Sequence, residues 1–314
     1  MPDLRRILHP TDFSEAAHAA ASHAVDLAVR ARAELHVLHV LEGEEDYDAV
    51  VHLAPDAEAR LNTRLREEIV ARMQRLDAVA REALDVSYEL AEGRAPAPAI
   101  QAHAEATAAD LIVMGLHGRT GLRGLRHRFF GGVAETVMRT APCPVLAVRE
   151  ETGPVEAPLR TVVVPVDFSE PSERVVAEAR RLAAPYGATL ALLFVAEEHL
   201  IPFFSDTGLP TFSVKKVDDE IVSRAGAALR QLDESTPGPP VEATYTVRTG
   251  TPVDEIVAFA KEQQAGLIAM ATHGFGRVER ALLGSVTERV IRLAPCPVWT
   301  ANPNALGMAA PTDA

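Results

Sequence analysis

Residues 271–286, ATHGFGRVERALLGSV, combine glycines with a serine in a loop that could bind a phosphate group. Ser285 directly follows Gly284 at the start of a helical pattern. Unpaired backbone N–H groups and the positive end of the helix dipole favour an anion there. A structural interpretation competes, because Ser285 and Glu288 have the spacing of a capping box and Gly274 could only permit a turn. The loop alone leaves both interpretations open.

Two carboxylates in similar sequences could each bind a polar group of a ligand. Asp12 in PTDFSE and Asp167 in PVDFSE each follow a short apolar run. A carboxylate at a strand end can accept a hydrogen bond from an amine or a hydroxyl of a ligand. Asp167 and Glu170, however, have capping-box spacing at a helix start, and this spacing by itself favours a helix cap.

The chain is an internal duplication. ILHPTDFSE at 7–15 returns as VVVPVDFSE at 162–170. GGVAETVMRTAPCPVLAV at 131–148 returns as GSVTERVIRLAPCPVWTA at 284–301. Order and spacing are both kept, so we expect two copies of one fold.

We place the first domain at 1–150 and the second at 158–303. The segment near 150–160, EETGPVEAPLR, is rich in Pro, Gly and Glu and is expected to be a linker. The tail after about Thr300 lacks periodicity, and we expect it to be disordered.

Each copy alternates short apolar runs with longer segments of helical spacing. This alternation predicts a parallel sheet with helices on both faces, in which ligands bind at the carboxyl ends of the strands. A long helix is expected at about 56–83 in the first copy and at 214–234 in the second. The apolar segment 197–212 could be a lid, a partner site or simple packing, and packing is favoured.

Composition disfavours several classes of function. The 314 residues carry a formal net charge of −13, which disfavours binding to nucleic acid or to an anionic membrane. No signal peptide opens the sequence, and no apolar run approaches the ~18–20 residues that span a bilayer, so a cytoplasmic protein is expected. Cys143 and Cys296 make no disulfide framework. No set of His, Cys and carboxylate residues has metal-ligand spacing, so we expect no metal held by side chains.

Together these residues resemble the universal stress protein family over nearly the whole chain. Nucleotide-binding members of that family carry the pattern G-x2-G-x9-G-[ST] after the fourth strand and an aspartate after the first. The resemblance implies two tandem α/β domains of the adenine nucleotide α-hydrolase type. Each would be an open five-stranded parallel sheet of order 3-2-1-4-5 flanked by helices. The implied ligand is ATP with Mg²⁺.

The resemblance also implies which residues contact the nucleotide. Asp167 would meet the adenine or the ribose, and Val195 would line the adenine pocket. The glycines and the serine of the loop would surround ribose and triphosphate. The implied ATP-binding residues of the second domain are Pro165, Val166, Asp167, Val195, Met270, Ala271, His273, Gly274, Gly284, Ser285, Val286 and Thr287. Those of the first domain are Asp12, Val40, Gly115, Gly118, Gly131, Gly132 and Val133.

The two copies depart from the family pattern in different ways. In the second copy Ala271 stands at the first glycine position, and we expect its methyl group to be harmless. In the first copy twelve residues, not nine, separate Gly118 from Gly131, and Gly132 replaces the serine. The second domain is therefore expected to be the main nucleotide site.

The favoured hypothesis is an ATP-binding universal stress protein with a regulatory role in the stress response. The alternatives are an interaction or scaffolding protein that keeps the fold without the nucleotide, and a slow ATPase. No catalytic residue is assigned, because neither a nucleophile elbow nor a Walker lysine is present. The fifth strands, PVLAVR and PVWTAN, could pair within the chain as an intramolecular pseudo-dimer, and two chains could pair further as a homodimer. The sequence does not specify a protein partner.

Overall fold

The computed structural model describes most of the chain, in segments separated by short gaps. The described residues are 4–42, 57–73, 84–93, 95–116, 132–155, 157–197, 200–204, 210–214, 219–272 and 283–308.

The first half alternates strands and helices. Its elements are β1 (Arg6–Pro10), α1 (Glu15–Ala31), β2 (Glu34–Glu42), α3 (Ala57–Met73), β3 (Val86–Gly93), α5 (Pro96–Ala106), β4 (Leu111–Gly115), α6 (Gly132–Thr140) and β5 (Val145–Val148). A short 3-10 helix, η1 (Glu150–Thr152), begins the connection to the second half.

The second half repeats this order with one addition. Its elements are β6 (Thr161–Pro165), α7 (Glu170–Ala183), η2 (Ala184–Tyr186), β7 (Thr189–Ala196), α8 (Asp219–Ser235), β10 (Ala243–Thr249), α9 (Pro252–Glu262), β11 (Leu267–Ala271), α10 (Ser285–Leu293) and β12 (Val298–Ala301). The addition is the antiparallel pair β8 (Leu200–Phe204) and β9 (Pro210–Val214).

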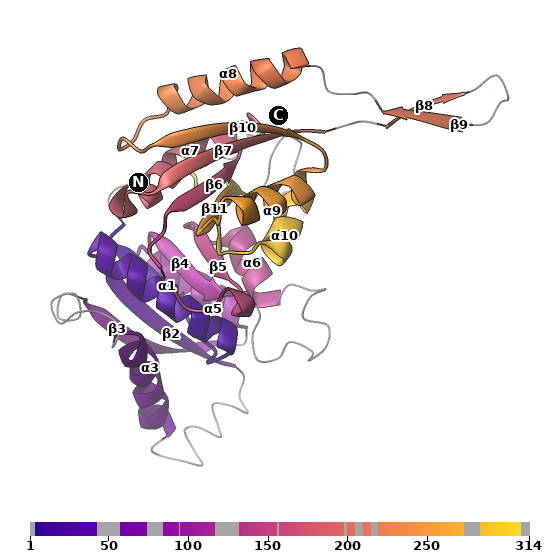
Figure 1. The fold of residues 1–314 in the computed structure, drawn as a ribbon. Helices are drawn as coiled ribbons and strands as arrows, with labels where there is room; N and C mark the ends of the chain where they lie inside the picture. The colour runs from indigo at the N-terminus through magenta and orange to yellow at the C-terminus, as the bar shows by residue number, and fades with distance from the viewer. Residues whose placement is uncertain are drawn as a thin grey trace.

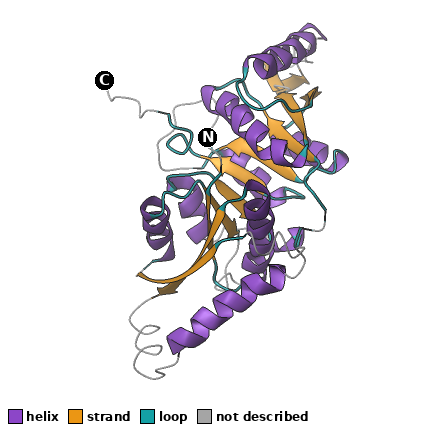
Figure 2. Cartoon of the chain, turned by 90° about the vertical axis from the view of Figure 1, so that its left-hand side faces the viewer, coloured by secondary structure: helices purple, strands orange, loops and turns teal. Residues whose placement is uncertain are grey.

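All main strands belong to one ten-stranded sheet of order β10-β7-β6-β11-β12-β5-β4-β1-β2-β3. Within each half the strands are parallel, and their order is 3-2-1-4-5, as predicted. Helices cover both faces of the sheet (Figures 1 and 2). This coverage explains why strands such as β4 and β11 are apolar along their length and buried on both sides.

Two apolar layers lie on the two faces of the sheet. One layer, which we call the α1/α7 face, packs residues of α1 and α7 against strand residues such as Leu111, Leu146 and Trp299. The other, the α6/α10 face, packs α5, α6, α9 and α10 against residues such as Ile112 and Ile268. Both layers run across the two halves, so the halves share their core.

Strands β5 and β12 join the two halves. They pair antiparallel, with Trp299 opposite Leu146. Side chains that follow each strand contact the last helix of the other half: Arg149 Nη1 donates to the Ala294 carbonyl at 3.2 Å, and Asn302 Nδ2 donates to the Ala141 carbonyl at 2.9 Å. Ala141 and Ala294 directly follow α6 and α10, where helix carbonyls lack intrahelical partners. Each half therefore caps a helix of the other.

Three expectations need correction. Residues 301–308 of the tail are ordered, because Asn302 is buried and its Oδ1 accepts from the Ala305 N–H at 3.0 Å. Packing is favoured by the sequence of the segment 197–212, but this segment contains most of the β8–β9 hairpin, which projects from the body of the molecule (Figure 1). The second-copy helix begins at Asp219 rather than at 214. Of the first-copy helix expected at about 56–83, residues 57–73 are helical and 74–83 lie outside the described part.

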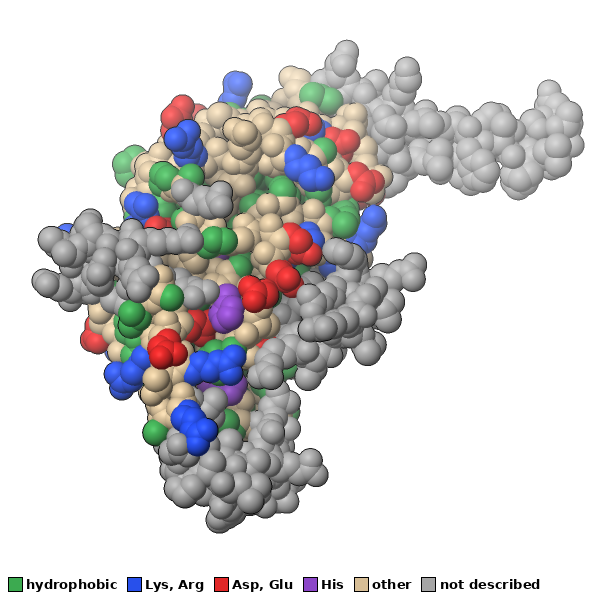
Figure 3. Space-filling view, turned by 60° about the horizontal axis from the view of Figure 1, so that its bottom comes forward, with side chains coloured by type: hydrophobic (Ala, Val, Ile, Leu, Met, Phe, Trp, Pro, Cys, Tyr) green, Lys and Arg blue, Asp and Glu red, His purple; other side chains and the backbone are tan. Residues whose placement is uncertain are grey.

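The surface carries both signs of charge. On the face in Figure 3, acidic and basic side chains of the described residues are interspersed, and the basic ones form no continuous patch. Within the described segments, no helix is both long and apolar enough to cross a membrane.

The linker contact to α1 contains a buried histidine. The ring of His23 hydrogen-bonds the backbone of Gly153, and its Nε2 atom is buried without a hydrogen-bond partner. Burial lowers the pKa of His23 from 6.5 to about 4, although the Gly153 bond and the charge of Asp26 oppose the shift. His23 is therefore neutral at physiological pH.

This histidine predicts acid sensitivity. Because its pKa is lower in the folded chain, stabilisation is complete above pH 6.5 and is lost as the pH falls toward 4. Between pH 7.5 and pH 5 the free energy of unfolding should fall by about 2 kcal/mol through His23 alone. Urea unfolding of the wild type and of His23→Gln at both pH values measures this, because glutamine does not titrate. Equal losses in the two proteins would contradict the assignment.

Candidate functional site

The carboxyl ends of β6, β7 and β11 meet at one edge of the second domain. Pro165 ends β6, Val195 lies near the end of β7, and Met270 and Ala271 end β11. The β6 and β7 ends are held in register because the Val166 N–H donates to the Leu193 carbonyl at 2.8 Å. The structure thus places these predicted site residues at the same edge of the sheet.

The loop after β6, which contains Asp167, has a constrained backbone. Phe168, directly after Asp167, has a φ of 59°, the left-handed region that a bulky residue rarely adopts. Its ring packs on Phe194 with the centroids 5.2 Å apart. Asp167 Oδ1 accepts from the Ser169 N–H at 3.0 Å and from the Ser169 hydroxyl at 2.5 Å. These contacts fix the carboxylate at the strand end.

The cap of α7 is not Asp167. Ser169 is the N-cap, and its hydroxyl accepts from the Ser172 N–H. The capping-box interpretation of Asp167 and Glu170 is therefore wrong by two residues, because the left-handed Phe168 delays the helix start. The first copy has the same loop: Ser14 caps α1, and Phe13 has a φ of 61°. The repeated D-F-S sequence is the feature from which the serine caps of both helices could have been identified.

Among the described residues, no side chain caps the first turn of α10. Gly284 precedes the helix in an extended conformation, with no side-chain cap. The first intrahelical bond runs from the Glu288 N–H to the Gly284 carbonyl at 2.9 Å. Ser285 is thus the first helical residue and not the N-cap, which excludes its capping-box interpretation. The N–H groups of Ser285, Val286 and Thr287 have no intrahelical acceptor, and Ser285 is exposed.

Two hydrogen bonds dock this helix end onto β11. The buried Thr287 hydroxyl donates to the Ala271 carbonyl at 2.9 Å, and the Gly284 N–H donates to the Thr272 carbonyl at 2.8 Å. Thr287 therefore positions the helix, and its side chain is 4% exposed. The repeat places Ala134 at the corresponding position of the first domain, where no hydroxyl is available.

The first glycine of the pattern does not face the helix N-terminus. Alternation along β11 puts Ala269 and Ala271 in the α1/α7 face, whereas Ile268, Met270 and the α10 residues lie in the other. In the first domain a Cβ on Gly115 would lie 2.7 Å from the backbone of Ala16 and Ala17 in α1. The glycine therefore permits close packing of the first helix. Ala271 leaves the helix N-terminus uncrowded, because it is on the opposite face.

The carboxyl edge of the first domain resembles that of the second but lacks a serine at the start of its last helix. The Asp12 carboxylate accepts from the Ser14 N–H at 3.0 Å, as in the second copy. Val40 and Val133 are half-buried on the α6/α10 face, and Gly132 begins α6 with open space around it. The predicted residues Gly118, Gly131, His273 and Gly274 lie outside the described part of the chain.

The described part of the second-domain edge has the physical features of an anion site. Three backbone N–H groups and the helix dipole favour a phosphate at α10. Within the described segments, no group of three or more His, Cys, Asp or Glu residues could hold a metal ion. Mg²⁺ at such an edge would be bound through phosphate oxygens and water, as it prefers. Burial raises the pKa of both free thiols, Cys143 and Cys296, to about 12, so they are neutral core groups.

Comparison with known proteins shows which proteins this chain is similar to. A model of the universal stress protein family matches residues 3–149 and 158–302. A universal stress protein of Methanocaldococcus jannaschii is 35% identical over 140 residues, which are 44% of this chain and 79% of that protein. One of Mycobacterium tuberculosis is 29% identical over 195 residues, 62% of each chain. The crystal structure of a universal stress protein from Archaeoglobus fulgidus has a TM-score of 0.69 at 22% identity, covering 96% of this chain and 99% of that one.

The positions of Gly115 and Ala271 predict unequal losses of stability when each is replaced by the residue of the other copy. Gly115→Ala should lower the free energy of unfolding by about 2–3 kcal/mol, because the methyl group meets the α1 backbone. Ala271→Gly should cost only about 1 kcal/mol, through the flexibility of glycine in a strand. Urea unfolding of the two variants measures both. Equal costs would contradict the packing role of Gly115.

Proposed function

Because the chain belongs to the universal stress protein family, we propose that its second domain binds ATP as part of a regulatory role in stress response. The observation that carries the proposal is the open first turn of α10, docked on β11 by Thr287. This turn offers backbone N–H groups and the Ser285 hydroxyl to the phosphates. The identity of the base as adenine and of the metal as Mg²⁺ is inferred from the family resemblance.

The remaining contacts follow from the edge on which α10 lies. Asp167, fixed by Ser169, would bind the ribose or the adenine edge. Val195 and Val286 pack on the same apolar cluster, so an adenine ring would lie against the α6/α10 face. His273 and Gly274 would complete the loop. We assign no catalytic residue, and slow hydrolysis is the most that we propose.

The first domain would contribute mainly structure. Gly132 replaces the serine and Ala134 replaces the positioning threonine, so its helix N-terminus has lost both hydroxyls. We propose domains at 1–150 and 158–303, arranged as a pseudo-dimer through β5 and β12 in a cytoplasmic protein. The second candidate function, a scaffold that binds no nucleotide, is favoured only by these losses in the first domain.

Matched substitutions at the two helix N-termini test the proposal. Ser285→Glu should weaken Mg·ATP binding at least tenfold, because its carboxylate repels the phosphates at α10. Gly132→Glu adds the same charge at α6, where the structure has open space, and should leave the affinity unchanged. Isothermal titration calorimetry measures both, with urea unfolding as the folding control. Wild-type affinity in Ser285→Glu, or no binding by the wild type, would overturn the proposal.

A further inference from the structure

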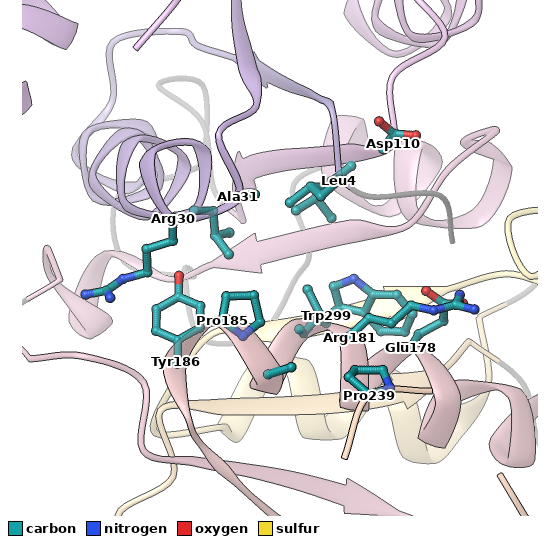
Figure 4. A pocket seen from close by; sticks show the side chains of 14 residues that line it. Leu4, Arg30, Ala31, Asp110, Glu178, Arg181, Pro185, Tyr186, Pro239 and Trp299 are labelled. Atoms are coloured by element: carbon teal, nitrogen blue, oxygen red, sulfur yellow. The ribbon is translucent and has the colours of Figure 1, made fainter. Parts of the chain in front are cut away.

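A groove runs along the β5–β12 junction on the α1/α7 face. It holds two neighbouring cavities of about 460 Å³ and 540 Å³. Both are lined by Leu27, Leu111, Leu182, Tyr186 and Trp299. We call the larger the linker chamber, because linker residues such as Pro154, Val155 and Pro158 line it, and the smaller, shown in Figure 4, the helix chamber. Both volumes lie in the ordinary range of small-molecule pockets, which occur preferentially between domains.

The groove is a consequence of joining two copies. On the α6/α10 face, the final helices cover the strand junction, whereas on the other face α1 and α7 flank it. The linker covers one part, and the Val155 N–H donates to the Ser22 hydroxyl at 3.1 Å. The floor between the helices is apolar, from Leu146, Leu267 and Trp299.

Tyr186 forms a fixed wall shared by the two chambers. Its hydroxyl donates to Asp26 Oδ2 on α1 at 2.7 Å, and the Arg30 guanidinium lies 4.5 Å from the centre of its ring. Burial and the adjacent Asp26 raise the pKa of Tyr186, so it stays a neutral donor. Figure 4 shows this hydroxyl pointing toward the helix that carries Arg30. A ligand would meet an aromatic edge and not an available carboxylate.

Charge distinguishes the chambers. In the helix chamber Glu178 is paired with Arg181 at 2.6 Å. In the linker chamber Asp26 is satisfied by Tyr186 and by Arg30 Nε at 3.1 Å, and His23 is neutral. Arg160 also lines this chamber; it is exposed, and among the described residues no carboxylate pairs with its guanidinium. The linker chamber thus has an apolar floor, and the positive charge of Arg160 has no carboxylate partner among the described residues.

We propose that the linker chamber binds a small aromatic molecule with a single anionic group, such as an aromatic carboxylate. The aromatic body lies on the floor formed by Leu146, Leu267 and Trp299, and the anion pairs with Arg160. An arginine fork matches a carboxylate in two parallel hydrogen bonds. This site is separate from the α10 site, which lies on the opposite face of the sheet.

The single tryptophan of the chain, Trp299, makes the site measurable. We choose 8-anilinonaphthalene-1-sulfonate as the probe, because it is aromatic, monoanionic and accepts energy from tryptophan. The wild type should bind one probe per chain with transfer from Trp299. Arg160→Met should weaken binding about tenfold, whereas Arg224→Met, an exposed arginine on α8, should not. Binding unaffected by Arg160→Met, or without transfer from Trp299, would overturn the proposal.

Two further experiments are controls. The first tests whether the charge of the probe contributes to binding, and the second tests whether the probe binds apart from the proposed nucleotide site. N-phenyl-1-naphthylamine, which lacks the sulfonate, should bind more weakly and equally to the wild type and Arg160→Met. A tenfold effect of Arg160→Met on this neutral probe would contradict the ion pair. Saturating Mg·ATP should leave the sulfonate probe bound, and its displacement by ATP would place the probe elsewhere. The outcomes with Arg160→Met and with the neutral probe do not depend on whether the second domain binds ATP.

Discussion

The antiparallel pairing of β5 with β12 is the constraint on which the rest of the structure depends. It joins two parallel sheets into one and buries the edge that each would otherwise expose. Arg149 and Asn302 extend the junction by capping α10 and α6 across it. Because the pairing is antiparallel, the carboxyl edges of the two halves face opposite ways. A ligand at one of these carboxyl edges would therefore not contact the other, so the edges are two separate candidate sites.

The two copies share the start of their first helix but differ at the start of their last helix. Each half retains the D-F-S loop with its left-handed phenylalanine, which fixes the start of the first helix and hence the core. The residues at the start of the last helix differ between the copies: Ser285 and Thr287 in one correspond to Gly132 and Ala134 in the other. The last helix thus forms both with and without these two hydroxyls at its start.

Much of the fold followed from the sequence, because duplication and apolar periodicity are local signals. The alternation of strands and helices and the parallel sheet were predicted on that basis, whereas the strand order 3-2-1-4-5 was implied by the resemblance to the universal stress protein family. The helix caps were misassigned, since Asp167 and Ser169 are both good caps and only the backbone of Phe168 decides between them. The face on which the Ala271 methyl lies could be assigned only from the two-residue alternation of β11 and from the packing of Gly115. The ordered tail depends on one buried side chain, Asn302, and the groove depends on the joining of two copies; neither leaves a periodic pattern.

The central claim is that one of two similar edges keeps a nucleotide site. Equilibrium dialysis of the full-length protein against labelled ATP with Mg²⁺ measures it directly, as moles bound per chain at saturation. We predict one ATP per chain. A value of zero would show that the open turn of α10 does not bind phosphate, and a value of two would show that the serine and threonine of the second domain do not decide binding.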